Sequence, residues 1–448
     1  MGLSRIMDIS QRALLNNRSA IDTVAKNIAN VNTDGYKRRR VDVAQLIGFG
    51  QVTSYTNREN MTRIRNRFIE SQLRNEQHKL GKFQTSEMLL RNVESIFGEP
   101  LQSGLNSVMS EFWNAWNDLG NNPENPSARV IVRDKSVLLG NTFNRLYNDL
   151  KGLQQEVGVD ISEKVKRVND LLRQINSING QLRKNSSSDL LDQRDSFVSE
   201  LATILNIEIR EYSDNDMTIS TGGRILISKD YLGEILMEGS YENGFANYIF
   251  RLNSGQEPLV ISSGELGSLI AVNNTNIPGF VQKLNQMAFN IAQYVNQIHR
   301  NGYNQNGVTN VNFFKDGITG AGDFAVSEEV RTNPDLIATS NVLGEPGNGT
   351  LAHMIFDLQT EPLFNNDTIT NFYHALISQV GSQVQEASFL RESQEMILQN
   401  LKNQQDSVSG VSLDEEMTHL IEYEKAFQAA ARLVNTADKM IDTLLSIV

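Results

Sequence analysis

The sequence predicts a mainly α-helical protein with long coiled-coil helices at both ends, a helical bundle formed by both halves of the chain, and a small inserted β-rich domain. Three observations predict this fold. Apolar residues recur every seven positions at each end, several internal tracts repeat them at helical spacing, and only residues 207–261 alternate as strands do. The expected segments are a coiled-coil segment with linker (1–60), the first half of the bundle (61–206), the β-rich domain (207–265), the second half (266–408) with a loop-rich stretch (302–350), and the C-terminal coiled-coil helix (409–448).

The first helix is expected to extend to about Val31. Two polar residues, Ser10 and Asn17, weaken its second heptad row but help to fix the register. Asp34-Gly35 predicts a turn that ends the helix. The main row holds Met7, Leu14, Ile21 and Ile28, and the second row holds Leu3, Val24 and Val31.

The C-terminal helix is expected to begin after Gly410 and to run to the end of the sequence. Ser412 followed by Glu415 predicts a capping box at its start. Its strict main row is Leu413, Leu420, Phe427, Val434, Ile441 and Val448, and its companion row is Tyr423, Ala430, Ala437 and Leu444.

Four internal tracts also have helical spacing and predict the helices of the bundle. A further long helical tract is expected over about 371–407. The four stripes are Leu105, Val108, Met109, Phe112, Trp116 and Leu119; Leu139, Phe143, Leu146, Leu150 and Leu153; Ile161, Val165, Val168, Leu172, Ile175 and Leu182; and Phe280, Leu284, Met287, Ile291, Val295 and Ile298.

The β-rich segment is expected to form short strands separated by turns. Its alternating pairs are Ile207 and Ile209, Met217 and Ile219, and Ile225 and Ile227. Asp214-Asn215-Asp216, Gly222-Gly223 and Asn253-Ser254-Gly255 supply the turn residues. Since helical tracts lie on both sides, we expect this segment to project from the bundle as an insert.

Composition narrows the possible partners. The 448 residues carry a net charge of -12, which argues against nucleic acid or an anionic membrane surface as the main partner. The chain has no cysteine, so disulfides and thiolate chemistry are excluded. Charged residues near the N-terminus interrupt the apolar core that a cleaved signal peptide needs, and no apolar run is long enough to span a membrane.

The search for catalytic and metal-binding motifs favours no enzyme, metal site or cofactor. None of the five histidines has the spacing of a zinc site, so each is interpreted as a surface or packing residue. Asp214 and Asp216 resemble the opening of a calcium loop, but Ile219 and Ile225 occupy the positions of the required glycine and glutamate. Ser412 lies in a near match to a nucleophile elbow and is better interpreted as a helix cap.

Lys37-Arg38-Arg39-Arg40 is the main basic run. We interpret it as a solvated strip after the first helix, in preference to a phosphate site, because no aromatic residues alternate with it for base stacking. A role in ion pairs between subunits is favoured less than the solvated strip and more than the phosphate site. The heptad rows could also be ordinary core packing within one domain, but their placement at both chain ends favours packing against each other and against neighbouring copies.

Several motifs together resemble one family. Residues 28–38, which include Asn30, Asn32, Thr33, Gly35 and Tyr36, are similar to the signature of flagellar rod, hook and junction proteins, with Asp34 where many relatives have proline. Leu190-Leu191-Asp192-Gln193-Arg194-Asp195, Gly264-Glu265-Leu266-Gly267 with Asn296, His299 and Gly302, and Phe313-Phe314 resemble the hook-associated protein 1 family, the hook-filament junction proteins. So do residues 409–416, which include Ser409, Gly410, Asp414, Glu415 and Glu416.

The resemblance implies a structural subunit at the hook-filament junction, exported unfolded without a cleaved signal peptide and located outside the cell. It implies as partners further copies of itself, the hook protein, the second hook-associated junction protein, and a cytoplasmic export chaperone on the C-terminal region. We expect the terminal helices, about 40 Å and 50 Å long, to form an antiparallel pair that carries assembly and is ordered only on assembly. The expected interface residues are Met7, Leu14, Ile21, Val24, Ile28, Val31, Leu413, Leu420, Tyr423, Phe427, Ala430, Val434, Ile441 and Leu444.

Two alternatives stay open on the sequence. A filament-type or second junction subunit shares the terminal-helix architecture but lacks the signature at residues 32–36. A secreted peptidoglycan hydrolase would need two fixed carboxylates in a concave site, and acidic pairs can be chosen almost at will from 53 acidic residues. The short β-rich segment implies that outer domains of longer relatives are reduced or missing.

Overall fold

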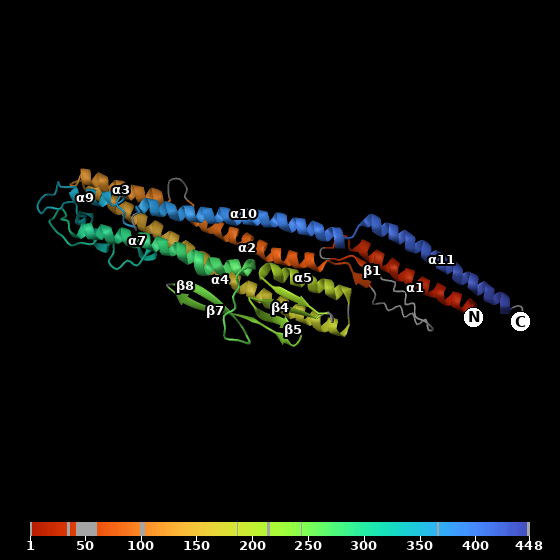
Figure 1. The fold of residues 1–448 in the computed structure, drawn as a ribbon. Coiled ribbons are helices and arrows are strands. Elements are labelled where there is room, and N and C mark those ends of the chain that lie inside the picture. The colour runs from red at the N-terminus through yellow and green to blue at the C-terminus, as the bar shows by residue number, and fades with distance from the viewer. Residues whose placement is uncertain are drawn as a thin grey trace. The chain divides into compact units, whose positions relative to one another are not determined.

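A computed structural model describes residues 2–33, 36–41, 61–98, 104–185, 187–212, 216–242, 244–364 and 367–445 (Figure 1). Long helices dominate, which confirms the predicted mainly α fold with a small β region. The chain divides into two compact units. The first comprises 1–80, 167–234 and 393–448, and the second comprises 81–166 and 235–392. None of the described helices is long and apolar enough to cross a membrane.

The helices follow the predicted apolar stripes closely. The six residues of the first internal stripe are all buried in α3, and the next two stripes merge into the single helix α4, which begins at a proline, a favoured first helical residue. Ile298 is the exception in the last stripe, since it is only half-buried. The long helices are α1 (Gly2–Ala29), α2 (Arg67–Phe97), α3 (Leu105–Asn121), α4 (Pro126–Lys184), α5 (Ser188–Ile204), α7 (Ile277–Arg300), α10 (Ile369–Ser409) and α11 (Leu413–Leu445).

The strands do not form one sheet. A four-stranded antiparallel sheet in the first unit has the order β3-β4-β5-β6, whereas a two-stranded hairpin, β7-β8, belongs to the second unit. The unit boundary therefore passes through the segment expected to be one insert. The bounds are β1 (Arg39–Val41), β2 (Met61–Arg63), β3 (Glu208–Glu211), β4 (Met217–Thr221), β5 (Arg224–Ser228), β6 (Tyr231–Leu232), β7 (Ile235–Glu242) and β8 (Phe245–Leu252), with β1 paired to β2.

A bulge modifies the predicted alternation in the four-stranded sheet. Gly222 and Gly223, at φ 53° and 75°, make the tight turn between β4 and β5. The register shifts between Ile219 and Ser220, so Ile225 is exposed and its neighbour Leu226 is buried instead. The alternating pattern alone placed Ile225 on the wrong face, because a sequence pattern does not reveal the extra residue that a bulge inserts into a strand. Of the predicted turn at 214–216, only Asp216 is described.

The loop-rich stretch after α7 supplies part of the core of the second unit. Phe313, Phe314 and Phe324 are fully buried, and the Phe314 and Phe324 ring centroids lie 4.5 Å apart. Asn296 of α7 holds this stretch by accepting from the Phe314 N–H at 2.8 Å and donating to its carbonyl at 3.0 Å. The short elements of the second unit are α6 (Gly264–Ala271) and η1 (Val272–Asn276) before α7, and η2 (Ala321–Asp323), α8 (Glu328–Thr332), η3 (Pro334–Leu336) and α9 (Thr350–Asp357) after it.

His299 is a buried packing residue, as interpreted from its lack of partners for a zinc site. Its Nε2 accepts from the Ala338 N–H at 2.9 Å, so Nδ1 carries the proton and donates to the Val311 carbonyl at 2.8 Å. Burial lowers the pKa of His299 from 6.5 to about 4. The neutral ring is thus the form that the fold requires.

We predict that this histidine makes the second unit sensitive to acid. Because the unfolded chain takes up the proton first, stability present above pH 6.5 should be lost as the pH falls towards 4, by roughly 3 kcal/mol. Urea unfolding of the native chain and of His299→Gln at several pH values checks this. The variant should be less stable at pH 7 and should show a shallower loss over that interval; parallel pH profiles would contradict the prediction.

Candidate assembly region: the terminal helices and the ion cluster at their base

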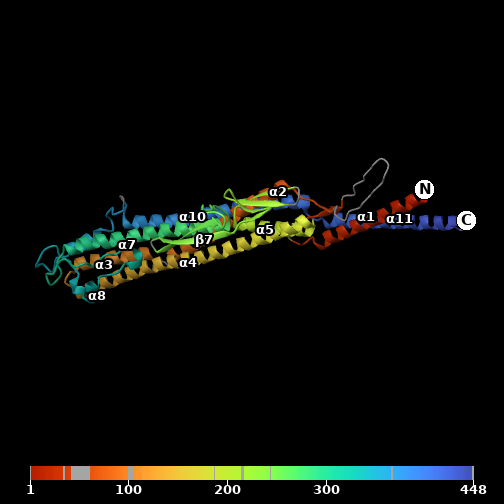
Figure 2. The same ribbon diagram turned by 90° about the horizontal axis from the view of Figure 1, so that it is seen from below.

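The two terminal helices pack against each other. Figures 1 and 2 show α1 and α11 side by side with both chain ends at the same end of the pair, so the helices are antiparallel. The Asn27 Nδ2 atom of α1 donates to Glu416 Oε2 of α11 at 2.9 Å, at the opposite end of the pair. Helices at the two extremes of the sequence therefore meet within one chain, and the expectation that they are ordered only on assembly has no support in this arrangement.

Small and polar side chains form the buried part of this pair. The hydroxyls of Ser10 and Thr23 are bonded to carbonyls of their own helix, at 2.8 Å each. Small residues at a contact let two helix backbones approach closely. The buried residues are Ser10, Ala20, Thr23, Val24 and Asn27 of α1, and Glu416, Ala430 and Ala437 of α11.

The large apolar residues of the heptad rows lie at the margins of this contact. Val24 and Ala430 are the two predicted interface residues that the pair buries. Leu413 and Phe427 are exposed, whereas the side chains of Leu3 and Leu444, and the whole of Val448, lie outside what the structure describes. The half-buried ones are Met7, Leu14, Ile21, Ile28, Val31, Leu420, Tyr423, Val434 and Ile441.

The pair also exposes apolar side chains that do not belong to the predicted interface set. Eight lie on α1 and α11 in addition to Leu413 and Phe427 and are close to half-exposed or more: Ile6, Ile9, Leu15, Met417, Ile421, Leu433, Met440 and Leu445. Exposed apolar surface of this extent is typical of a protein interaction site. A single chain thus leaves much of its terminal apolar surface uncovered.

Asn27 is the centre of the polar contacts at the base of the pair. Its Oδ1 atom accepts from the Arg39 N–H at 3.0 Å and from the Tyr36 hydroxyl at 2.9 Å, while Nδ2 donates to the Arg39 carbonyl and to Glu416. The side chain is almost completely buried with both of its ends bonded. Asn27 therefore joins α1, the signature segment and α11.

The basic run is not a solvated strip, and that interpretation was wrong for three of its four residues. Lys37 and Arg39 are buried and Arg38 is half-buried, whereas Arg40 is exposed. Lys37 binds Glu70 and lies 3.0 Å from Asp195, and Arg38 reaches Glu416 at 2.7 Å and Glu415 at 2.8 Å. The sequence hides this because the acidic partners lie at least 30 residues away along the chain.

Asp192 and Asp195 of α5 complete an ion cluster around this run. Arg39 Nη2 lies 2.7 Å from Asp192 Oδ2, and Arg63 Nη1 lies 2.9 Å from Asp192 Oδ1 and 2.8 Å from Asp195 Oδ2. Burial alone would raise the pKa of Asp195, but Lys37 and Arg63 outweigh burial and the pKa lies below its ordinary value. We call Lys37, Arg38, Arg39, Arg63, Glu70, Asp192, Asp195, Glu415 and Glu416 the base cluster.

The C-terminal motif enters the base cluster through the junction of α10 and α11. The buried Ser409 accepts the Arg38 N–H on its carbonyl at 3.1 Å. Gly410 N–H donates to the Asp406 carbonyl at 2.8 Å, and a Cβ atom at Gly410 would lie only 2.4 Å from that oxygen. Ser412 O accepts the Glu416 N–H, and the carboxylate of Glu415, expected in a capping box, is engaged by Arg38.

Comparison with known protein families identifies the relatives of this chain. The model of the flagellar hook-associated protein FlgK helical domain matches residues 90–314, half of the chain. The chain belongs to the FlgK family. Models of flagellar basal body rod proteins match the two ends, the rod protein model at residues 7–37 and the C-terminal model of the FlgEFG rod proteins at residues 404–447. The chain is accordingly a structural component of the bacterial flagellum that assembles with other flagellar components.

Full-length relatives agree with the FlgK family. Flagellar hook-associated protein 1 of Bacillus subtilis is 28% identical over 98% of this chain and 97% of its own length. The Salmonella typhimurium protein of the same name is 22% identical over 99% of this chain and all of its own. The flagellar hook junction protein FlgK from Burkholderia pseudomallei shares the fold, with a TM-score of 0.68 and 14% identity, covering 75% of this chain and 100% of that structure.

Three of the family motifs, at residues 28–38, 190–195 and 409–416, supply residues of the base cluster, and the sequence did not reveal this. Tyr36 stacks on Arg39, whose guanidinium carbon lies 5.0 Å from the ring centroid. Thr33 donates to Asn30, which donates to the Lys26 carbonyl; Asn32 and Asp414 are exposed, and Gly35 is outside the described residues. Asn27 and Arg63 were missed, although an asparagine in an apolar helical repeat is a known signal for a buried polar contact.

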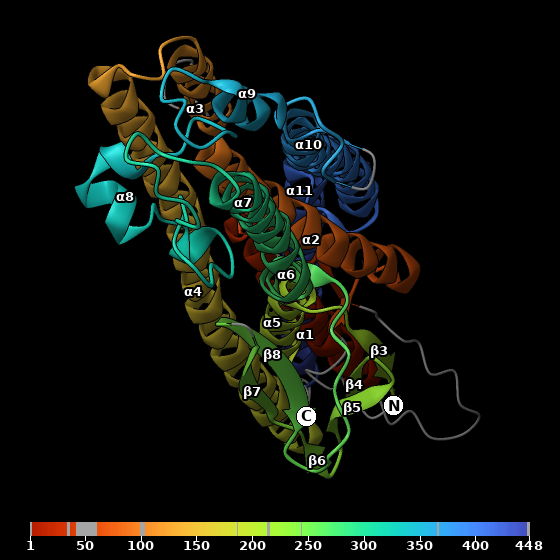
Figure 3. The same cartoon turned by 90° about the vertical axis from the view of Figure 1, so that its left-hand side faces the viewer.

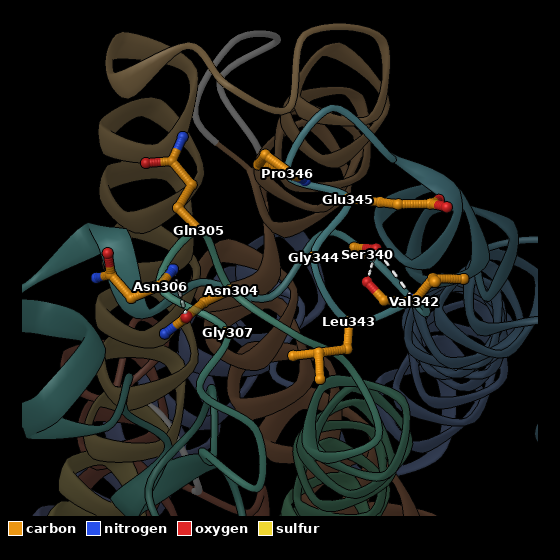
Figure 4. A pocket seen from close by; sticks show the side chains of 10 residues that line it. All are labelled: Asn304, Gln305, Asn306, Gly307, Ser340, Val342, Leu343, Gly344, Glu345 and Pro346. Carbon is orange, nitrogen blue, oxygen red and sulfur yellow. Dashed lines mark hydrogen bonds between the residues drawn. The ribbon is translucent and has the colours of Figure 1, made fainter.

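No metal-binding group of acidic and histidine residues occurs in the part of the chain that the structure describes. A small hollow in the second unit, about 210 Å³, lies between the loops 304–307 and 340–346 (Figure 4). Leu343 faces Gly307 across it, and Glu345 is its one charged lining residue. It has no pair of fixed carboxylates of the kind that a glycoside hydrolase needs.

Proposed function

We propose that this FlgK-family chain is a subunit of the junction between hook and filament, needed for filament assembly and motility. One observation carries the proposal: the antiparallel pair of α1 and α11 leaves large apolar side chains on its surface. A neighbouring copy, the hook protein and the second hook-associated junction protein are the partners that would cover them by coiled-coil packing.

The proposed role is structural and the protein is not an enzyme. The proposed location is outside the cell at the hook-filament junction, which the protein would reach by export without a cleaved signal peptide. A filament-type role would instead distribute the protein along the whole filament, and a peptidoglycan hydrolase would release sugar fragments from cell wall. Immunogold labelling and a cell-wall digestion assay separate these outcomes.

Deletion of the protein tests the proposal directly. We expect the deleted strain to keep its hooks, to lack filaments, and to release flagellin into the medium. Filament subunits would then have no binding site at the end of the hook. Electron microscopy of the cells and immunoblotting of the medium measure this. Normal filaments on the deleted strain would refute the junction role.

We further propose that an export chaperone binds the C-terminal region, as in the resemblance described above. Removing residues 409–448 should then abolish chaperone binding, because the exposed apolar side chains of α11 are lost with it. Titration calorimetry with the purified chaperone measures this. Unchanged affinity for the truncated chain would place the chaperone elsewhere.

A further inference from the structure

On the edge of strand β8 that faces away from β7, in the second unit, side-chain amides hydrogen-bond the backbone groups. Gln154 accepts from the Ala246 N–H at 3.2 Å and donates to its carbonyl at 3.0 Å. Asn274 does the same for Tyr248, at 3.1 Å and 2.8 Å. These two side chains satisfy the outward backbone groups of β8 as a third strand would.

The outer edge of β7 is open by contrast. The register pairs Tyr241 with Ala246 and Gly239 with Tyr248. Since Ala246 and Tyr248 turn their backbone groups away from β7, Tyr241 and Gly239 turn theirs away from β8. Within residues 216–242 and the other described ranges, no hydrogen bond reaches these outward groups, and Gly239 is exposed. Such an edge is a template for another strand.

A groove runs beneath this open edge. Figure 3 shows β7 and β8 beside α4. The groove lies between this helix and the inner face of the hairpin, encloses about 380 Å³, and has Tyr241 and Val159 on its rims, 83% and 59% exposed. Gly158 fixes its depth, because a Cβ atom there would lie 2.5 Å from the Tyr248 hydroxyl oxygen. The Tyr248 ring therefore rests on the helix backbone, and the groove stays open beside it.

The surroundings of the groove are acidic. Glu163 lines the groove, and Glu156 and Asp160 are exposed on the same stretch of α4. None of the three makes an ion pair with any residue the structure describes. Lys151 is the only basic residue among those lining the groove. Unpaired carboxylates beside an open strand edge favour a positively charged chain over a neutral or acidic one.

We propose that the β7 edge binds an extended basic segment of a partner protein, which adds as a third strand and directs its apolar side chains into the groove. Backbone hydrogen bonds at Gly239 and Tyr241 supply affinity, and the alternate side chains supply selectivity. Val159 and Tyr241 would contact the apolar positions, and Glu163 and Asp160 the basic ones. The site goes beyond the assembly role of the terminal helices and does not depend on it.

Two variants at one position separate the backbone from the side chain. The probe is a short acetylated peptide of alternating arginine and valine, and its binding to the full chain is measured by fluorescence anisotropy. Tyr241→Ala removes the ring, whereas Tyr241→Pro also removes the outward N–H and blocks an incoming strand. We expect Tyr241→Pro to bind about tenfold more weakly than Tyr241→Ala, with native thermal unfolding in both.

A charge variant keeps the test decisive if the proline variant fails to fold. Asp160→Lys combined with Glu163→Lys alters only exposed side chains and should also weaken binding about tenfold, and a peptide with glutamate in place of arginine should not bind. Absence of binding by the native chain, or equal binding by Tyr241→Pro and Tyr241→Ala, would overturn the proposal. A dimer of the native chain that Tyr241→Pro abolishes would assign the edge to a second copy and overturn it too.

Discussion

An Asp195→Ala protein should lose roughly 3–5 kcal/mol of local stability around the base cluster. Asp195 faces Lys37 at 3.0 Å and Arg63 at 2.8 Å, and both cations are largely buried. Removing the carboxylate leaves these charges without their shared partner in a poorly hydrated place. Hydrogen-exchange mass spectrometry of α5 and of residues 36–41 measures the loss as a fall in the opening free energy.

Asp189→Ala is the matched control for this experiment. Asp189 also lies 2.7 Å from Arg39, but its side chain is 77% exposed, so its loss should cost less than about 1 kcal/mol. The two aspartates are on the same helix and the substitutions are chemically identical. Similar losses of stability in both variants would show that burial of the base cluster does not determine how much it contributes to local stability.

A Phe427→Asp protein should be exported but should fail to support filaments. Phe427 is 36% exposed in the single chain, and burying such a side chain against a neighbour contributes roughly 1.5–3 kcal/mol. An aspartate there would forfeit this and place an unpaired charge in the contact, which costs more still. The measurement is filament number per cell by electron microscopy, with circular dichroism to show that the helices persist.

Gln428→Asp introduces the same charge one residue along, on the exposed polar side of α11. Glu424, Arg432 and Asn435 lie on this side as well, so another charge should be tolerated and filaments should form. Normal filaments with Phe427→Asp would remove Phe427 from the interface. Absence of filaments with both variants would instead indicate that the whole surface of α11 is buried on assembly. A charge at Leu420 should behave like Phe427→Asp.

The helices were predictable because the periodic spacing of apolar residues within each helix indicates which side chains are buried. Phe112 and Trp116 of α3, and Leu172 and Ile175 of α4, are fully buried as the stripes predicted. The antiparallel pairing of the terminal helices was predicted as well. The residues buried between these two helices were less well predicted. Counting heptads favours large residues, yet the buried positions include Ala20, Ala430 and Ala437.

The base cluster could not be predicted from local pattern. Lys37 and Asp195 are 158 positions apart, and a basic run has the same sequence signature whether it is solvated or buried. The same limit applies to the strands, since the split between β6 and β7 depends on which unit each strand packs in. Local sequence determines the elements, whereas charges at long separation determine how the motifs meet.

The base cluster also sets the order in which the chain can mature. Arg38 is satisfied by Glu415 and Glu416, some 377 positions later, so the contact cannot close until nearly the whole polypeptide has emerged. A chain that ends before residue 415 lacks both acidic partners of Arg38. The contact that joins the signature segment to the start of α11 is therefore among the last of the base cluster to form.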